Sequence, residues 1–250
     1  MKHPKQSAPI AVFDSGVGGL SVLNHLQKQL PHEHILYFAD QANIPYGGHA
    51  LSSIQQFCHE IVRFLLVEQV KMVVVACNTA SAAALSQLRF DFPDVPFVGM
   101  EPAVKPAAKS TKTNVVGVMA TAGTFSSERY ASLMKRYGSD IEVIEDPCIG
   151  LVELIEAGHF ENTAVIQKLR SITQPMLDAR ADTLVLGCTH YPFVQSLLTQ
   201  IAGEHVTIID PAPAVALQAK RVLKENHLLA QNGQQPRVRF ISSGIDTNLN

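Results

Sequence analysis

The sequence lacks a run of apolar residues long enough to cross a membrane, a Cys-x-x-Cys pair and an excess of charge of one sign. Lys plus Arg number 20 and Asp plus Glu number 22, a formal charge of −2, which does not favour nucleic acid or an anionic membrane as a partner. Four cysteines in 250 residues form no disulfide framework, and no His/Cys spacing matches a zinc site. We therefore expect no metal, no nucleic-acid partner and no membrane partner.

Two features bear on compartment and size. The first nine residues are polar, and the apolar stretch Ile10–Phe13 after them is too short for a signal-peptide core, so a cytoplasmic location is expected. A chain of 250 residues can bury a substantial core, as one α/β domain or as two smaller ones.

One stretch carries the strongest chemical signal: Val73-Val74-Val75-Ala76-Cys77-Asn78-Thr79-Ala80. The apolar residues are typical of a buried parallel strand, and Asn78 and Thr79 are predicted to cap a helix that follows. The sequence therefore predicts that the Cys77 thiol lies at the N-terminus of a helix, where the helix dipole favours a thiolate.

A second stretch repeats this pattern: Leu184-Val185-Leu186-Gly187-Cys188-Thr189-His190. Again an apolar strand ends in a small residue, a cysteine and a polar side chain. Two such elements, one in each half of the chain, indicate two reactive thiols on opposite sides of one cleft.

Strand and helix patterns alternate along the whole chain, which predicts an α/β fold with mostly parallel sheets. Polar turns follow the predicted strands at Asp14, Cys77, Thr121 and Cys188. The turn at Thr121 should open a helix over 126–137, and its threonines could hold an anion or only cap that helix. Carboxyl ends of parallel strands line ligand crevices, so these turns should surround the site.

The first glycine-rich turn, Asp14-Ser15-Gly16-Val17-Gly18-Gly19, has an alternative interpretation as a dinucleotide loop, with Asp40 placed for a ribose. Ser21 occupies the position of the third glycine, and a carboxylate before the turn would repel phosphate, so we favour another role for Asp14. It could move a proton near a thiol, or it could only close an Asx-turn.

Two thiols allow several chemistries. Cys188 with His190 could be the nucleophile and base of a hydrolase or amidotransferase, the two cysteines could be a redox pair, or both could be inert. A fourth possibility is inversion of a carbon stereocentre, in which a thiolate removes a proton from one face and a thiol returns one to the other. Asp14 and His190 would then assist Cys77 and Cys188.

Five motifs, in this order along the chain, resemble those of glutamate racemases: Asp14-Ser15-Gly16-x-Gly18-Gly19, Pro45-Tyr46-Gly47, Ala76-Cys77-Asn78-Thr79-Ala80, Ala120-Thr121 with Thr124, and Gly187-Cys188-Thr189-His190-Tyr191-Pro192. The resemblance implies a cofactor-independent racemase that supplies D-glutamate for peptidoglycan. It also implies that Cys77 acts on D-glutamate, Cys188 acts on L-glutamate, and Asp14 and His190 assist. The substrate-binding residues implied are Asp14, Ser15, Pro45, Tyr46, Gly47, Asn78, Thr79, Thr121, Thr124, Glu153, Thr189 and His190.

The family fold implied by the resemblance is two α/β lobes with mostly parallel sheets, related by pseudo-twofold symmetry, with the active site in the cleft between them. The first lobe would comprise residues 1–98 plus 211–250 and carry Cys77, and the second would comprise residues 99–210 and carry Cys188. An aspartate racemase or another amino-acid racemase of the superfamily remains an alternative, as does a ligand-binding protein that keeps only the cleft. The substrate would be the small molecule glutamate, and the sequence leaves a homodimer open.

Overall fold

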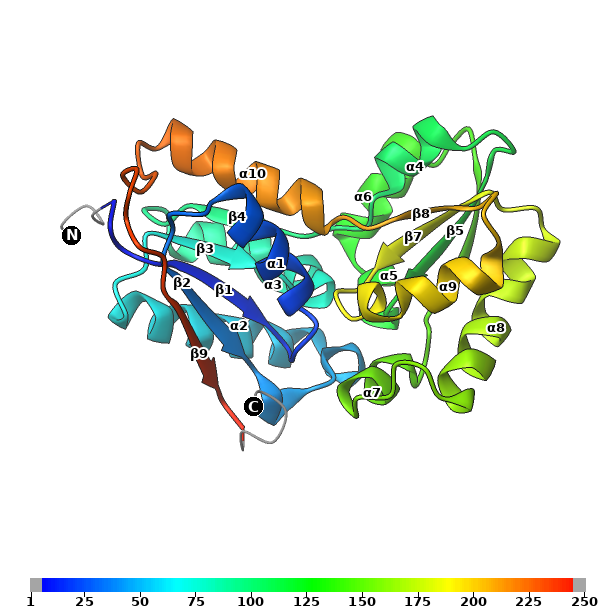
Figure 1. Ribbon diagram of the computed structural model, residues 1–250, viewed down its shortest axis with the longest axis horizontal. Helices are drawn as coiled ribbons and strands as arrows, with labels where there is room; N and C mark the ends of the chain where they lie inside the picture. Colours follow the sequence, from blue (N-terminus) through cyan, green and yellow to red (C-terminus); the bar gives the residue numbers. More distant parts are fainter. Residues whose placement is uncertain (1–5, 245–250) are drawn as a thin grey trace. The chain divides into compact units, whose positions relative to one another are not determined.

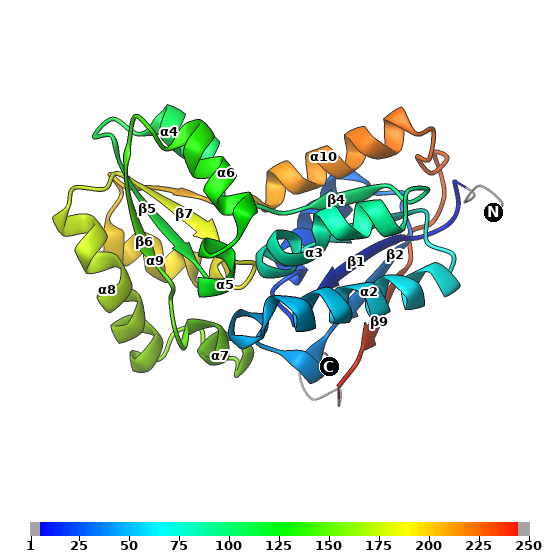
Figure 2. The same cartoon turned by 180° about the vertical axis from the view of Figure 1, so that it is seen from behind.

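A computed structural model describes residues 6–244 and divides the chain into two compact units. One unit runs to Met100 and resumes at Ala212, and the other is Glu101–Pro211. The first predicted lobe also includes residues 1–5 and 245–250, which lie outside the described residues. Each unit is an α/β structure around its own parallel sheet (Figures 1 and 2), which confirms the predicted fold class of two α/β lobes.

The sheet of the first unit has five parallel strands in the order β4-β3-β1-β2-β9. Their bounds are β1 (Ile10–Asp14), β2 (Ile35–Ala39), β3 (Met72–Val75), β4 (Phe97–Gly99) and β9 (Val238–Ser242). Every residue of β1, β2 and β3 is buried, because helices cover both faces of the sheet.

Helices pack on both faces of this sheet (Figure 1). One face carries α1 (Leu20–Gln29) and α10 (Ala212–Glu225), and the other carries α2 (Leu51–Val67) and α3 (Asn78–Asp91). Two short 3₁₀ turns, η1 (Gln41–Asn43) and η2 (Tyr46–Gly48), connect β2 to α2. The helix α10 therefore returns the chain to the unit in which it began, and β9 then adds the edge strand beside β2.

The sheet of the second unit has four parallel strands in the order β6-β5-β7-β8. Their bounds are β5 (Val115–Ala120), β6 (Glu142–Asp146), β7 (Thr183–Gly187) and β8 (Thr207–Ile209). The two central strands, β5 and β7, are buried along their whole length.

Helices again cover both faces. One face carries α4 (Val104–Ser110) and α6 (Glu128–Tyr137), and the other carries α7 (Leu151–Glu156), α8 (Thr163–Asp178) and α9 (Gln195–Ala202). The short α5 (Ala122–Phe125) follows β5, and the 3₁₀ turn η3 (Tyr191–Val194) follows β7. Within residues 6–244, none of the helices combines the length and apolarity needed to cross a membrane.

The helix predicted over 126–137 is wrong at its start. Thr121 caps the separate four-residue helix α5, and Ser127 then caps α6 through a hydrogen bond that its side chain accepts from the Tyr130 N–H. Thr121 and Ser127 each cap a helix, so the chain forms a short helix within the predicted polar turn and begins the second helix at Glu128 rather than at Ser126.

Candidate active site

The first thiol lies where β3 meets α3. Cys77 is the N-cap of α3, and its Sγ accepts a hydrogen bond of 3.5 Å from the Ala80 N–H. The predicted caps, Asn78 and Thr79, are wrong, because both are already inside the helix. The thiol therefore occupies the place where a side-chain oxygen normally satisfies the free amides of the first turn, and these amides stabilise a thiolate.

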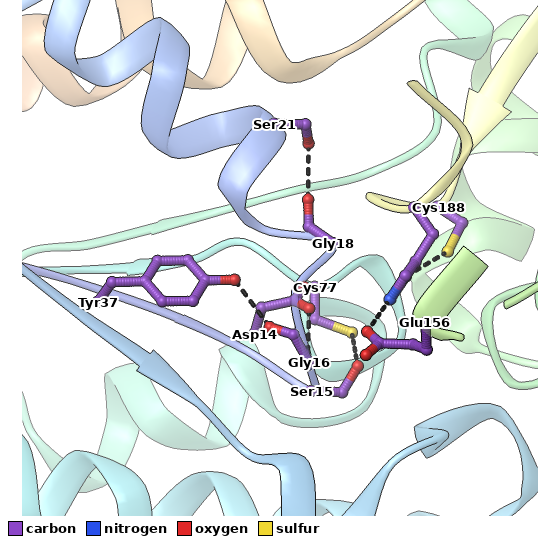
Figure 3. A network of polar contacts seen from close by, with 10 residues as sticks. Asp14, Ser15, Gly16, Gly18, Ser21, Tyr37, Cys77, Glu156 and Cys188 are labelled. Atoms are coloured by element: carbon purple, nitrogen blue, oxygen red, sulfur yellow. Dashed lines mark hydrogen bonds and ion pairs between the residues drawn. The ribbon is translucent and has the colours of Figure 1, made fainter. Parts of the chain in front are cut away.

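The turn after the neighbouring strand β1 brings a hydroxyl to this thiol. The Ser15 Oγ lies 3.8 Å from the Cys77 Sγ, and both residues are almost fully buried (Figure 3). The fully buried Asp14 accepts a hydrogen bond of 2.9 Å from the Gly16 N–H, so its carboxylate does form the Asx-turn that the sequence left open. The parallel pairing of β1 with β3 explains why the two turns meet.

Asn78 is the least satisfied polar residue of this region. Its side chain is 2 % exposed, and neither its Oδ1 nor its Nδ2 has a hydrogen-bond partner within the described residues. Burying an amide without partners costs about 1–3 kcal/mol. An amide left in this state beside Cys77 is suited to a ligand that supplies both an acceptor and a donor. Thr79, next in the chain, is buried as well.

The turn that contains Pro45, Tyr46 and Gly47 packs against the helix α3 of the same unit. The Tyr46 hydroxyl donates a hydrogen bond of 2.5 Å to Asp40 Oδ2. Burial raises the pKa of Tyr46 far above its ordinary value, and nearby Cys58, Asp40 and Cys77 raise it further, so the hydroxyl keeps its proton. Asp40 thus has partners in its own chain in place of the ribose that the dinucleotide alternative required.

The second thiol follows β7 in the other unit. Gly187 precedes it, and a Cβ there would lie 2.7 Å from the Ala120 Cβ and 2.8 Å from the Met119 carbonyl oxygen. Only glycine allows β5 and β7 to approach this closely just before Cys188. No α-helix begins at Cys188; the 3₁₀ turn η3 starts at Tyr191, so the two cysteine turns differ in their capping.

The partner of Cys188 is an imidazole. The Cys188 Sγ lies 3.5 Å from His190 Nδ1, and His190 Nε2 lies 2.6 Å from Glu156 Oε1, with His190 1 % exposed. Glu156 projects from α7 toward this group (Figure 3). Thiol, imidazole and carboxylate form a continuous chain along which a proton can move.

The resemblance to the family implies a substrate-binding role for Glu153 and names no role for Glu156. The structure places Glu153 on the exposed side of α7, whereas Glu156, three residues further on, contacts His190. The two glutamates lie in one short helix, and the sequence pattern alone does not show which of them faces a residue 34 positions away.

Three threonines complete the second group. Thr121 caps α5 by accepting from the Thr124 N–H, and the two hydroxyl oxygens lie 3.1 Å apart. Thr124 and Thr189, the residue after Cys188, are each 1 % exposed. Thr121 does cap a helix, but this helix is α5 and not the predicted helix over 126–137. An anion-binding role for Thr121 remains a prediction.

The other two cysteines show no such chemistry. Burial raises the pKa of Cys58 and of Cys148 well above the ordinary thiol value, so both stay protonated. Within residues 6–244, the His, Cys, Asp and Glu side chains form no group of three or more that could hold a metal ion.

Each unit therefore presents a buried thiol at the carboxyl end of a parallel strand, with a different polar partner in each case. A thiol held at a helix N-terminus and a thiol paired with an imidazole are both suited to taking and returning a proton. Comparison with known proteins identifies the class. The model of the Asp/Glu/Hydantoin racemase family matches residues 14–219. The chain belongs to this family and is an isomerase, an amino-acid racemase.

Relatives and solved structures agree with this class. The chain is 50 % identical over 239 residues to a glutamate racemase of Pseudomonas putida, a match that covers 96 % of this chain and 90 % of the relative. It is 48 % identical over 247 residues to a glutamate racemase of Pseudomonas syringae pv. tomato, covering 99 % and 90 %. The structure is similar to that of Escherichia coli glutamate racemase, solved with L-glutamate and the activator UDP-MurNAc-ala, with a TM-score of 0.85, 32 % identity and 96 % and 91 % of the two chains covered.

Proposed function

We propose that this protein is a glutamate racemase that interconverts L- and D-glutamate by transferring the Cα proton through two thiols, without a cofactor, and that its product supplies peptidoglycan synthesis. The observation that carries the mechanism is the pair of buried thiols at strand ends, each with its own proton-handling surroundings. The choice of glutamate is supported by the glutamate racemases among the relatives and by the L-glutamate bound to the Escherichia coli neighbour.

In the L to D direction, the Cys188 thiolate removes the Cα proton of L-glutamate, and the electron pair remains as a carbanion delocalised into the α-carboxylate. The Cys77 thiol then gives its proton to the opposite face, which yields D-glutamate and leaves a Cys77 thiolate. The reverse reaction uses the same two thiols in exchanged roles. The chemistry requires both thiols to reach the Cα of one substrate molecule.

Each thiol needs a different kind of help. His190 lies within reach of the Cys188 Sγ and can hold its proton, and Glu156 fixes the orientation of the imidazole. The helix amides stabilise the Cys77 thiolate, and Ser15 lies beside it. We assign Asp14 the role of assisting Cys77, in keeping with the resemblance to the family.

Several polar residues are assigned to the substrate. Asn78 carries the most weight, because its buried amide has no hydrogen-bond partner among the residues that the structure describes and can bond a substrate carboxylate or ammonium group. The remaining assignments follow the resemblance and the position of the side chains at the two turns: Ser15, Pro45, Tyr46, Gly47, Thr79, Thr121, Thr124, Thr189 and His190.

A second candidate function has one specific observation in its favour. A cysteine hydrolase or amidotransferase needs a nucleophile, a base beside it and a group that orients the base, and Cys188, His190 and Glu156 are arranged in this order. That function would make Cys77 dispensable, whereas racemisation requires it.

Circular dichroism separates these functions. Purified protein incubated with L-glutamate, D-glutamate or L-aspartate should abolish the optical signal of both glutamate enantiomers and leave aspartate nearly unchanged. Cys77→Ser and Cys188→Ser should each remove this activity. Loss of the aspartate signal alone would show that the protein is a racemase but that glutamate is not its substrate. Ammonia release from glutamine that survives Cys77→Ser would support the amidotransferase instead.

A further inference from the structure

Asp40 has three side-chain partners, Asn43, Tyr46 and Ser243, and nothing so far gives it a role in the reaction. It follows β2 directly and is 2 % exposed. Its Oδ1 accepts hydrogen bonds from Asn43 and Ser243, and its Oδ2 accepts from Asn43 and Tyr46. A buried carboxylate held by three side chains is fixed in one orientation.

The partners of Asp40 come from two distant parts of the sequence. Asn43 and Tyr46 belong to the turns between β2 and α2, which carry Pro45 and Gly47. Ser243 directly follows β9, 203 positions away, and its Oγ lies 2.6 Å from Asp40 Oδ1. Ser243 also binds the same region by its backbone, because its N–H donates to the Ala39 carbonyl oxygen.

The position of Ser243 follows from the sheet. The strand β9 pairs in parallel with β2, with Ser242 opposite Ala39. The residues that follow, Ser243 and Asp40, therefore lie next to each other. The Ser243 Oγ also accepts a hydrogen bond of 3.1 Å from the Ala42 N–H. One hydroxyl thus contacts both the carboxylate and the backbone of the turn that leads to Tyr46.

Tyr46 connects this network with the first thiol. Its hydroxyl bonds to Asp40, its ring lies in the same buried cluster as Cys77, and its turn η2 packs against α3. We propose that Asp40 is a positioning residue that fixes the Pro45–Gly47 turn beside Cys77, and that Ser243 sets the orientation of the Asp40 carboxylate. The strand β9 and the residue after it then complete the Cys77 half of the site. This inference rests on the proposed function, because the turn is assigned to the substrate there.

The test compares Ser243→Ala with Ser242→Ala. Ser242 is a matched control, since it lies one residue earlier and its Oγ exchanges hydrogen bonds with Gly244 instead of Asp40. Removing one hydrogen bond to a carboxylate should raise the KM for glutamate about fivefold to tenfold in Ser243→Ala and change kcat less than about threefold. Ser242→Ala should match wild type, and Ser243→Thr, which keeps the hydroxyl, should restore the KM.

A double-mutant cycle separates positioning from a loss of general stability. Tyr46→Phe and Ser243→Ala both act through Asp40, so their effects on KM should be strongly non-additive in the double variant. If the two substitutions damaged the structure independently, their fold-changes in KM would multiply in the double variant. That result, or an unchanged KM in Ser243→Ala, overturns the inference.

A second measurement does not depend on activity. Hydrogen exchange of residues 41–48, followed by mass spectrometry, should be faster in Ser243→Ala than in Ser242→Ala and wild type. Inactive wild-type protein would refute the proposed function alone, and the exchange comparison would still decide the role of Ser243. Equal exchange in all three proteins would refute that role even if wild type racemises glutamate.

Discussion

Replacing Glu156 with glutamine tests whether the carboxylate on α7 serves the second thiol. Glu156 Oε1 lies 2.6 Å from the Nε2 of the buried His190, the Glu156 side chain is 11 % exposed, and glutamine keeps the size of the side chain while removing its charge. A hydrogen bond to a charged group contributes about 2 kcal/mol, which corresponds to about a 30-fold fall in kcat/KM. Because enantiomers have equal free energy, the fall must be the same in both directions.

The matched control is Glu153→Gln, on the same helix but exposed. It should retain kcat/KM within about twofold, since surface changes have small effects. The primary deuterium isotope effect is a second measurement. Glu156→Gln impairs His190, so the effect should increase more for Cα-deuterated L-glutamate, the enantiomer assigned to Cys188, than for Cα-deuterated D-glutamate. The reasoning is refuted if Glu156→Gln keeps wild-type activity or if Glu153→Gln is impaired equally.

Three further predictions concern binding and stability. Asn78→Ala should raise the KM about tenfold without lowering the unfolding free energy in a denaturant titration, because the buried amide that it removes has no hydrogen-bond partner within residues 6–244; an unchanged KM with lost stability would contradict this. Gly19→Ala should lower the unfolding free energy by about 1–3 kcal/mol, since a Cβ there would lie 2.7 Å from the Asp14 Cβ, and a fully stable variant would show that the turn adapts. Burial alone would raise the pKa of Asp182, but bonds from Thr111, neighbouring amides and Thr183 outweigh it and lower the pKa below its ordinary 3.8. Because the folded-state pKa of Asp182 is depressed, its ionised carboxylate stabilises the fold above about pH 4, and this contribution is lost as the pH falls through the folded-state pKa. The difference in unfolding free energy between wild type and Asp182→Asn should therefore shrink in acid. A difference that stays constant with pH would refute the assignment.

Local pattern was sufficient for most of the fold. The continuous apolar run at residues 35–39 predicts a buried parallel strand, and the structure forms β2 over these residues. No local pattern predicts the helix α4, because it is only seven residues long and contains Pro106, a residue that usually interrupts a helix. Pro106 is the third residue of α4, where a missing N–H removes no helical hydrogen bond.

The sequence also located both thiols and His190 correctly at strand ends, because strand and turn are local properties. Local sequence does not predict the groups that contact these residues through the tertiary structure. Cys77 is itself the helix cap, a role that sequence preferences assign to oxygen side chains. The hydrogen bond of Asp40 to Ser243 depends on β9 joining β2 across most of the chain, and no local pattern contains that information.

The most direct test of the two-thiol account is to follow deuterium at Cα during the first tenth of the conversion of L-glutamate in deuterium oxide. A thiol holds a single proton, so the proton removed by Cys188 cannot be the one that Cys77 delivers. The account predicts that the D-glutamate formed carries deuterium at Cα while the remaining L-glutamate is almost entirely protiated. Deuterium entering substrate and product pools equally, or product that retains the substrate proton, would indicate a single base and contradict it.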